Sequence, residues 1–321
     1  MTARSGTVWL VGDIGATNAR FGLVSPDGAI VHSSTFADTD FATIGDAVRG
    51  YLTQSGRAAT PRIGCLAIAA PVGGDEIRMT NHPWSFSVGG LRDELGFDRL
   101  EIINDFAAVA LALPRLKPND RIPVGGGASV AGRPIAILGP GSGLGASGLI
   151  PVGRSWLPLT GEGGHARMPA ATEREDAVLA WMRRHFDHVS AERCLSGPGL
   201  VNLYSALAEL DGAPAASYTA AQITDPAIGA QDPLCREATA MFCAMLGTVA
   251  GDLALTLGAQ GGVFIAGGIV PRLGARFIES GFRARFEAKG RLSSYVAAIP
   301  TYVVTHSLPA FLGCAAVLAA T

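Results

Sequence analysis

A carboxylate stands where a predicted strand becomes a predicted helix. In "EIINDF" (101–106), apolar β-forming residues are followed by Asn104 and Asp105, and the next residues predict a helix over 106–113. Because aspartate is a common N-cap, Asp105 could simply cap this helix. In open α/β sheets, however, ligands bind at the carboxyl ends of strands. Asp105 could therefore also take a proton from a bound molecule, and both roles stay open.

Two further stretches contain side chains that could bind a molecule rich in hydroxyl groups. "TGEGGHARM" (160–168) supplies Glu162 and His165 among glycines, and "SAERCLSGPG" (190–199) supplies Glu192. Since a carboxylate can accept two hydroxyl protons at once, such residues suit the neighbouring hydroxyls of a polyol. Simpler interpretations exist: a solvated loop acid for Glu162, a first-turn helix acid for Glu192 and a surface imidazole for His165.

Three glycine-rich segments predict phosphate sites: "GDIGATN" (12–18), "GPGSGLG" (139–145) and "AGGI" (266–269). In such turns backbone N–H groups can converge on a phosphate without side chains in the way. None of the three contains the lysine of a P-loop, because the two lysines of the chain are Lys117 and Lys289. A dinucleotide-binding fingerprint must open a helix, whereas the residues after position 145 predict a strand. Two similar turns and a third glycine pair therefore favour a nucleotide held from two sides.

Other groups in these turns could assist phosphate binding. The hydroxyls of Thr17 and Ser142 are possible donors, and Asp13 could hold Mg²⁺ through water because hard cations prefer oxygen ligands. Any one glycine-rich hairpin could also be only a turn.

The elements around these residues predict an α/β chain with two related lobes. The pattern of strand, glycine-rich turn and strand at 7–25 is repeated at 133–152, which suggests that each lobe begins with such a hairpin. Later residues predict helices, among them one opened by a capping box of Thr172 and Glu175. Prolines between positions 114 and 123 indicate a lobe boundary. The tail "HSLPAFLGCAAVLAA" (306–320) predicts a helix that could pack on the first lobe.

The composition excludes several classes of protein. The chain has 321 residues, of which 48% are apolar and 16% charged, so it is expected to be compact and globular and not disordered. The formal net charge is −2 and no basic stretch stands out. Nucleic acid is therefore not an expected partner.

Neither a membrane nor a metal cluster is expected. The apolar segment 241–259 carries Asp252 and three glycines, whereas a membrane span needs about 20 apolar residues, so we predict a buried helix. The apolar run before Asp13 is too short for a signal peptide, which favours the cytoplasm. Five scattered cysteines without a C-x-x-C pair argue against a disulfide framework or a zinc knuckle. His185 and His188, with no partner evident, are interpreted as surface residues.

Six blocks of the sequence occur in this order along the chain: "GDIGATNARFGLV", "MTNHPWSFS", "EIINDFAAVA", "GEGGH", "AERCLSGPGLVNLY" and "GGVFIAGGIVPR". Together they resemble the bacterial glucokinase family of the proteobacterial type. The resemblance implies the hexokinase/actin-like (ribonuclease H-like) fold, with two α/β lobes and a cleft between them. Residues 1–115 with 306–321 would form the small lobe, and residues 116–305 the large lobe.

The resemblance also implies an activity: phosphorylation of D-glucose to glucose 6-phosphate by ATP with Mg²⁺, the entry step of glycolysis, in a cytoplasmic homodimer. Asp105 would then be the general base for the 6-hydroxyl. The residues that would contact the sugar are Asn104, Asp105, Glu162, His165 and Glu192. The residues that would contact ATP are Gly12, Asp13, Ile14, Gly15, Ala16, Thr17, Gly141, Ser142, Gly143, Gly267 and Gly268, with Asp13 holding Mg²⁺ through water.

Two positions differ from the pattern of the family, and three other functions stay open. Ala16 stands where the family usually has a second glycine, and Ser142 replaces a threonine but keeps the hydroxyl. The alternatives are a kinase for another hexose, such as mannose or fructose, a sugar sensor that binds glucose and ATP without turnover, and an actin-like polymerising ATPase. An intact Asp105 argues against the sensor, and the sugar-binding acids argue against the polymer. The sequence does not separate hexose epimers, nor ATP from ADP or polyphosphate as donor.

Overall fold

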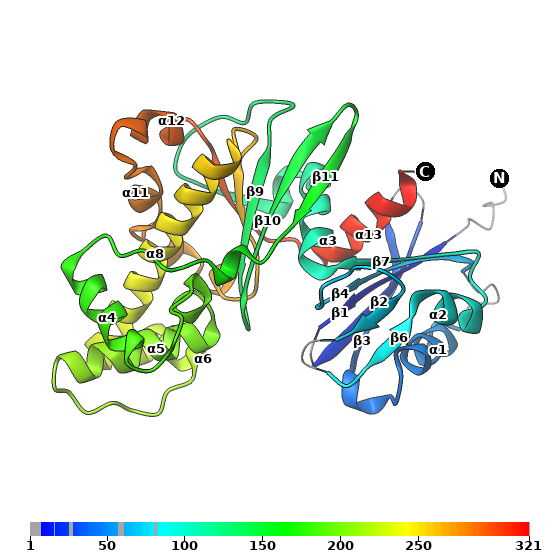
Figure 1. The fold of residues 1–321 in the computed structure, drawn as a ribbon, viewed down its shortest axis with the longest axis horizontal. Coiled ribbons are helices and arrows are strands. Elements are labelled where there is room, and N and C mark those ends of the chain that lie inside the picture. Colours follow the sequence, from blue (N-terminus) through cyan, green and yellow to red (C-terminus); the bar gives the residue numbers. More distant parts are fainter. Residues whose placement is uncertain (1–7, 16, 26–27, 57–60, 80–81, 321) are drawn as a thin grey trace. The chain divides into compact units, whose positions relative to one another are not determined.

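The computed structural model describes residues 8–15, 17–25, 28–56, 61–79 and 82–320. The chain forms two compact units. Unit 1 comprises residues 1–116 and 306–321, and unit 2 comprises residues 117–305. In both, a sheet is covered by helices (Figure 1), which confirms the predicted α/β class.

In the described part of unit 1, a five-stranded sheet has the order β3-β2-β1-β4-β7. The predicted first hairpin is present, because β1 pairs antiparallel with β2. On its other side β1 pairs parallel with β4, and β4 pairs parallel with β7. The strands are β1 (Trp9–Ile14), β2 (Asn18–Val24), β3 (Ile30–Ala37), β4 (Ile63–Ile68) and β7 (Arg99–Asn104), with β5 (Glu76–Arg78) and β6 (Ser85–Ser87) in a separate two-stranded sheet.

Helices cover both faces of this sheet (Figure 1). Successive side chains of a strand point to opposite faces, and β1 shows this directly. Leu10 and Ile14 pack with α1 (Ile44–Gln54) and α2 (Val88–Leu95), whereas Val11 packs with α3 (Asp105–Ala112) and α13 (Pro309–Ala319). Short 3-10 helices follow β3 and α3, namely η1 (Asp38–Asp40) and η2 (Leu113–Arg115).

The C-terminal helix α13 packs on the first unit, as the tail sequence predicts. Phe311 and Cys314 are fully buried on the β1 and β4 face of the sheet. Contact with α3 is very close, because a Cβ added at Gly313 would lie 1.8 Å from the carbonyl oxygen of Ala108. The glycine therefore lets the two helix backbones approach each other.

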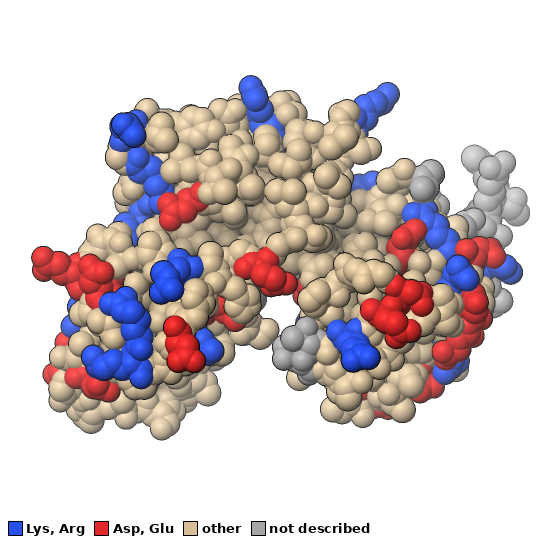
Figure 2. All heavy atoms as spheres, in the orientation of Figure 1, with Lys and Arg blue, Asp and Glu red and all other residues tan. Residues whose placement is uncertain are grey.

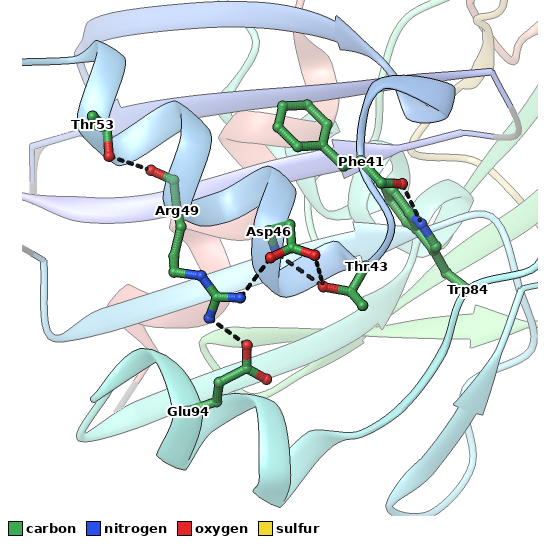
Figure 3. A network of polar contacts seen from close by, with 7 residues as sticks. All are labelled: Phe41, Thr43, Asp46, Arg49, Thr53, Trp84 and Glu94. Carbon is green, nitrogen blue, oxygen red and sulfur yellow. Dashed lines mark hydrogen bonds and ion pairs between the residues drawn. The ribbon is translucent and has the colours of Figure 1, made fainter.

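The α1 and α2 helices are joined by polar contacts at their exposed surface (Figure 3). Arg49 of α1 donates to Asp46 at 2.8 Å and also to Glu94 of α2. Nearby, the indole N–H of Trp84 donates to the carbonyl oxygen of Phe41 at 3.3 Å. Because the three charged side chains are exposed by more than 40%, solvent screens their ion pairs, which contribute little to the stability of the unit.

In the described part of unit 2, the sheet has the order β11-β10-β9-β12-β13-β8. Its β9–β10 hairpin is antiparallel, and β9, β12 and β13 are parallel. The five strands from β11 to β13 thus repeat the plan of unit 1, as predicted for two related lobes, but unit 2 begins with β8 and its hairpin follows. The strands are β8 (Arg121–Val124), β9 (Ile135–Pro140), β10 (Leu144–Val152), β11 (Ser155–Thr160), β12 (Val263–Ile265) and β13 (Thr301–Val304).

One core joins this sheet to the helices of unit 2. The long helix α8 runs beside α5 and α11 in Figure 1. The helices are α4 (Glu173–Arg183), α5 (Gly197–Leu210), α6 (Ala220–Ile223), α7 (Pro226–Gln231), α8 (Pro233–Leu257), α9 (Val270–Leu273), α10 (Ala275–Ile278), α11 (Phe282–Glu287) and α12 (Ser293–Ala297), with the 3-10 helices η3 (Pro118–Asp120), η4 (Gly163–His165), η5 (Ala191–Arg193) and η6 (Gly290–Leu292).

Helix α8 is the one described helix that is long and apolar enough to cross a membrane by length and composition. Its most apolar window is 56% buried inside the protein, as a core helix would be. The helix begins after the cap residue Asp232, with Pro233 in its first turn, and ends at Gly258, whose φ is +60°. Asp252 of this helix is paired with Lys289 at 2.6 Å.

The predicted capping box at the start of α4 is only half present. Thr172 accepts the N–H of Glu175 as expected. The carboxylate of Glu175, however, accepts the N–H of Ala171 at 2.8 Å and binds Arg285 of α11 at 2.7 and 2.9 Å. Since Glu175 is 3% exposed, its charge requires such a partner, and this pair joins α4 to α11.

All five cysteines are buried and none forms a disulfide. Burial raises the pKa of the thiols of Cys235 and Cys243 to about 11 and of Cys194 to about 12. These thiols stay protonated at neutral pH, which fits the prediction that they act as small buried hydrophobic residues.

Candidate functional site

In unit 1, the carboxyl ends of three parallel strands meet at one edge of the sheet. Ile14 at the end of β1 pairs with Ile68 of β4, and Ile68 pairs with Asn104 at the end of β7. The first glycine-rich turn follows β1 directly, and Asp105 follows β7. The structure therefore brings this turn and the Asn104–Asp105 pair to the same edge, where ligands bind in open α/β sheets.

Helix α3 is capped by Asn104, so the hypothesis that Asp105 is the N-cap is wrong. The side-chain oxygen of Asn104 accepts the N–H groups of Phe106 and Ala107, both at 3.0 Å. Its amide nitrogen donates to Ala70 at 3.3 Å and to Oδ1 of Asp105 at 3.1 Å. Asp105 is the first helical residue, and its Oδ1 also accepts the N–H of Phe106 at 2.8 Å. The positive end of the helix favours the ionised carboxylate.

Asp13 lies on β1 and is mostly buried. Its side chain is 24% exposed and pairs with Arg20 of β2 at 3.2 Å. Burial raises the pKa of this carboxyl, and the neighbouring guanidinium opposes the rise. Among the described residues, no group of three or more His, Cys, Asp or Glu side chains could hold a metal. A single carboxylate fits Mg²⁺ nonetheless, because this ion keeps several waters and binds mainly to substrate phosphates.

The first glycine-rich turn is tight. The N–H of Gly15 donates to the carbonyl oxygen of Asn18 at 3.0 Å, and Thr17 is exposed. A Cβ at Gly12 would lie 2.7 Å from a side-chain methyl group of Leu66, so a larger residue here would have to displace side chains packed on the sheet. Ala16, which stands where the family has a glycine, lies outside the described residues.

Sequence reasoning missed a buried acid beside this turn. Asp38 donates its backbone N–H to the carbonyl oxygen of Thr17 at 3.1 Å. Its side chain is 0% exposed, and neither carboxylate oxygen has a hydrogen-bond partner in the described part of the chain. Burial raises the pKa of this carboxyl, and His82 opposes the rise. The only sequence signal is an acid at the end of β3, a place where solvated acids are common.

In unit 2, the structure brings Glu192 and His165 to the second glycine-rich turn. Oε2 of Glu192 accepts the N–H of Leu144 at 2.8 Å, and Oε1 lies 3.9 Å from Nε2 of His165. Glu192 is on η5 and His165 is on η4. Glu162 precedes η4 and is exposed.

The loops that carry these side chains are held together by backbone contacts. Ala191 donates to the carbonyl oxygen of Ala166 at 2.8 Å, and Met168 donates to that of Val189 at 3.1 Å. His188 is exposed, as the sequence interpretation expects, and its Nε2 lies 2.8 Å from the carbonyl oxygen of His165.

The paired glycines after β12 lie beside the second turn. Gly267 has φ of +81°, and a Cβ there would lie 2.3 Å from the carbonyl oxygen of Pro140, so no other residue type fits. A Cβ at Gly141 or Gly268 would meet open space, and Ser142 is exposed. These positions could therefore be approached closely by a ligand.

The predicted residues thus divide between the units. Unit 1 holds the first turn with Asn104 and Asp105, and unit 2 holds the second turn and the glycine pair with Glu162, His165 and Glu192. Each unit has one phosphate-type turn beside polar side chains that suit hydroxyl groups.

Comparison with known proteins identifies the family. The family model described as glucokinase matches residues 10–321. The glucokinase of Aromatoleum aromaticum is 52% identical over 310 residues, which cover 96% of this chain and 94% of the relative. The chain belongs to the glucokinase family. The predicted resemblance is thereby confirmed.

Solved glucokinases have the same fold. The crystal structure of a glucokinase from an Antarctic psychrotroph is 39% identical, with a TM-score of 0.90 over 98% of this chain and 99% of that one. A ROK family glucokinase from Streptomyces griseus, in complex with glucose and AMPPNP, has a TM-score of 0.65 at 17% identity over 97% and 98% of the two chains. At that identity the likeness concerns the fold alone. Together they confirm the predicted two-lobed α/β fold.

Proposed function

We propose that this chain catalyses the ATP-dependent phosphorylation of D-glucose to glucose 6-phosphate. The observation that carries the proposal is membership of the glucokinase family over nearly the whole chain, at 52% identity to a named glucokinase. The reaction forms a bond between the 6-oxygen of the sugar and the γ-phosphorus, and breaks the bond from that phosphorus to ADP. The proton of the 6-hydroxyl needs an acceptor.

In unit 1, Asp105 is the proposed acceptor of that proton. Its position at the start of α3 places the carboxylate at the positive end of the helix dipole, where a negative charge is favourable. Oδ1 is fixed by the N–H of Phe106 and by the amide of Asn104, at 2.8 and 3.1 Å. Because the carboxylate is held in one orientation, a hydroxyl can be bound in line for transfer. Asn104 is itself locked by capping the helix and is proposed to contact the sugar.

In unit 2, Glu162, His165 and Glu192 are the proposed partners of the remaining sugar hydroxyls. Carboxylates accept hydroxyl protons, and an imidazole can donate or accept. A sugar that lacks a matching hydroxyl leaves such groups unpaired, and sites of this kind can discriminate by about 10⁴-fold.

The two turns are the proposed phosphate sites. Their backbone N–H groups and the hydroxyls of Thr17 and Ser142 would neutralise phosphate oxygens, and Gly267–Gly268 would lie near the nucleotide. Mg²⁺, held through water by Asp13, would supply further charge stabilisation. Phosphoryl transfer has a loose transition state, so positioning and charge stabilisation account for most of the rate.

The cellular setting and assembly are also proposed. Each compact unit has its own core, which supports the proposed division of the chain into two lobes. Acidic and basic side chains are interspersed on the face shown in Figure 2, and the net charge is small, so this face offers no basic surface for nucleic acid. A cytoplasmic homodimer is proposed from the resemblance to the family.

Glucose-dependent release of ADP tests the proposed function. We would measure ADP formed from ATP and Mg²⁺, with glucose, mannose, fructose or N-acetylglucosamine in parallel. Strong stimulation by glucose alone is expected. Stimulation by another hexose instead would support the proposed mechanism but contradict glucose as the substrate. Glucose binding without any turnover would favour the sugar sensor.

Replacing Asp105 by Asn tests the proposed base. An amide cannot take the proton, so kcat should fall on the order of 10²–10⁴-fold, while the Kd for glucose changes little. Asp176→Asn, an exposed acid on α4, is the matched control and should retain full turnover. Turnover of the Asp105 variant within a few fold of the wild type would show that Asp105 is not the base.

A further inference from the structure

We propose that Glu192 serves both ligands of unit 2. One carboxylate oxygen binds the sugar, and the other holds the second glycine-rich turn in the shape that binds the nucleotide. Glu192 is thus a positioning residue for the phosphate site as well as a sugar-binding residue. The inference rests on the proposed kinase function and adds to it a connection between the two substrates.

The first part of the argument is the contact with the turn. Leu144 is the first residue of β10, and its N–H donates to Oε2 of Glu192 at 2.8 Å. A Cβ at Gly143 would lie 2.4 Å from the same oxygen. Glycine at this position therefore leaves space for the carboxylate as well as for a phosphate. A hydrogen bond to a charged acceptor is stronger than one between neutral groups, so Glu192 orients this end of the turn firmly.

The second part is that the same segment holds the other end of the turn. The N–H of Gly197, at the start of α5, donates to the carbonyl oxygen of Gly141 at 2.8 Å. Between these two contacts, the N–H of Gly141 donates to Gly143 at 2.8 Å. The turn from 141 to 144 is therefore fixed at both ends by residues 192–197, and it cannot shift without moving this segment.

The third part is that the segment is itself rigid. The hydroxyl of Ser196 donates to the backbone oxygen of Glu192 at 2.8 Å, and Ser190 accepts the N–H of Arg193 at 3.4 Å. The N–H of Ala191 reaches Ala166 of the loop that carries His165. The backbone of Glu192 is thus fixed. The orientation of its carboxylate therefore depends on the groups that this carboxylate binds.

The fourth part is the second oxygen. Oε1 of Glu192 lies 3.9 Å from Nε2 of His165, which is too far for a hydrogen bond. A hydroxyl group placed beside both atoms could donate to Oε1 and accept from Nε2 at ordinary distances. The side chains are 31% and 59% exposed, so a ligand can reach them. A sugar hydroxyl bound there would restrain the carboxylate that holds Leu144.

The inference predicts an effect that sugar binding alone would not produce. Glu192→Ala removes the acceptor of the Leu144 N–H, so the turn loses its support even when no sugar is present. Because the hydrogen bond is charge-assisted, we expect Mg²⁺-AMPPNP to bind about tenfold more weakly without sugar. In the wild type, glucose should lower the Kd for AMPPNP. In the variant, the ratio of the Kd values without and with glucose should fall close to one. Isothermal titration calorimetry measures the Kd for AMPPNP in both conditions.

Two further variants separate this role from sugar binding and from general damage. Glu162→Ala should weaken glucose binding but leave the sugar-free affinity for AMPPNP within twofold, because Glu162 has no hydrogen bond to the turn in the described residues. Glu279→Ala, an exposed acid in the same unit, should match the wild type in both titrations. Glu192→Gln keeps an oxygen that can accept from Leu144 and should lose only about threefold in AMPPNP affinity. If Glu192→Ala does not fold, Glu192→Gln still tests the inference.

The outcomes distinguish the inference from the proposed function. If the Glu192 variants lose glucose affinity but bind AMPPNP without sugar as tightly as the wild type, the inference is overturned and the kinase function stands. If the wild type releases no ADP with any sugar and binds no AMPPNP, the proposed function itself fails. Weakened sugar-free AMPPNP binding in the Glu192 variants, with normal binding in Glu162→Ala, supports the inference.

Discussion

At the scale of single residues, Asp38 combines full burial with a carboxylate that has no hydrogen-bond partner among the described residues. Burial raises the pKa of this group, against the effect of His82. A raised pKa in the folded state means that the group favours folding while protonated. This contribution is present below the unfolded value of 3.8 and is lost as the pH rises through the folded pKa. At neutral pH, Asp38 therefore destabilises the protein.

We predict that Asp38→Asn stabilises the protein at pH 7. The amide carries no charge to bury, so the free energy of unfolding should rise by about 1 kcal/mol. This gain should shrink as the pH falls toward 4, where the carboxyl of the wild type becomes protonated. Urea unfolding at both pH values measures it, with the exposed Asp40→Asn as control. A less stable variant at pH 7 would mean that the charge of Asp38 has a stabilising partner.

Residue-level predictions succeeded where a side chain acts through its neighbours along the chain. Thr172 occurs at a helix start as expected. Asn104 and Asp105 are both common cap residues, and their order in the sequence does not reveal which one leaves the strand in a β conformation. The structure shows that Asn104 does, with ψ of 143°.

At the scale of elements, the hairpins were predictable because alternation and glycine turns are local signals. The β1–β2 and β9–β10 pairs form where the sequence indicates. The position of α13 depends on contacts with residues far away in the sequence, because an apolar helix surface can pack on several different elements. Its contact with α3 is decided by small residues at one crossing, Gly313 and Ala108.

We predict that Gly313→Ala destabilises the protein, although alanine is the better helix former. In an exposed helix this change would stabilise by about 0.5–1 kcal/mol. Here the added Cβ would lie 1.8 Å from the carbonyl oxygen of Ala108, so α13 must move away from α3. The free energy of unfolding should fall by about 1–3 kcal/mol.

Gly90→Ala provides the matched comparison. Gly90 is exposed in α2, and its Cβ would make only ordinary contacts with Ser87, at 3.4 Å and beyond. This variant should be as stable as the wild type or more so in the same urea titration. If Gly313→Ala were equally stable, the close approach of α13 and α3 would not be a constraint on the fold.

At the scale of the whole molecule, two units with the same order of five strands each contain a glycine-rich hairpin as their first pair. The sheet plan explains why the phosphate-type turns occur twice. Polar residues follow a strand end in unit 1 and lie beside the second turn in unit 2. The two units thus share a sheet plan and differ in the side chains beside each turn.

We predict that the chain stays in the supernatant when a lysate is cleared of membranes without detergent. The most apolar window of helix α8 is 56% buried inside the protein, and Asp252 of this helix is paired with Lys289, so leaving the core would expose both the apolar surface and the charges. Sedimentation with membranes would contradict this prediction.

We also predict that the purified chain forms a homodimer. Its mass by light scattering should then be about twice 33.0 kDa. A monomer mass at all concentrations would contradict the proposed homodimer.

The sequence by itself determined the α/β class, the two hairpins, the buried helix α8 and the family, because periodicity, turns and motif spacing are properties of neighbouring residues. The same motifs predicted which side chains could bind a sugar or a phosphate. Only the tertiary structure decided which of them meet. Glu192 reaches Leu144 across 48 positions, Glu175 pairs with Arg285 across 110, and the buried carboxylate of Asp38 has no hydrogen-bond partner among the described residues. A periodic pattern indicates that one face of a helix or strand is buried. Which other element buries that face depends on the packing of the whole chain.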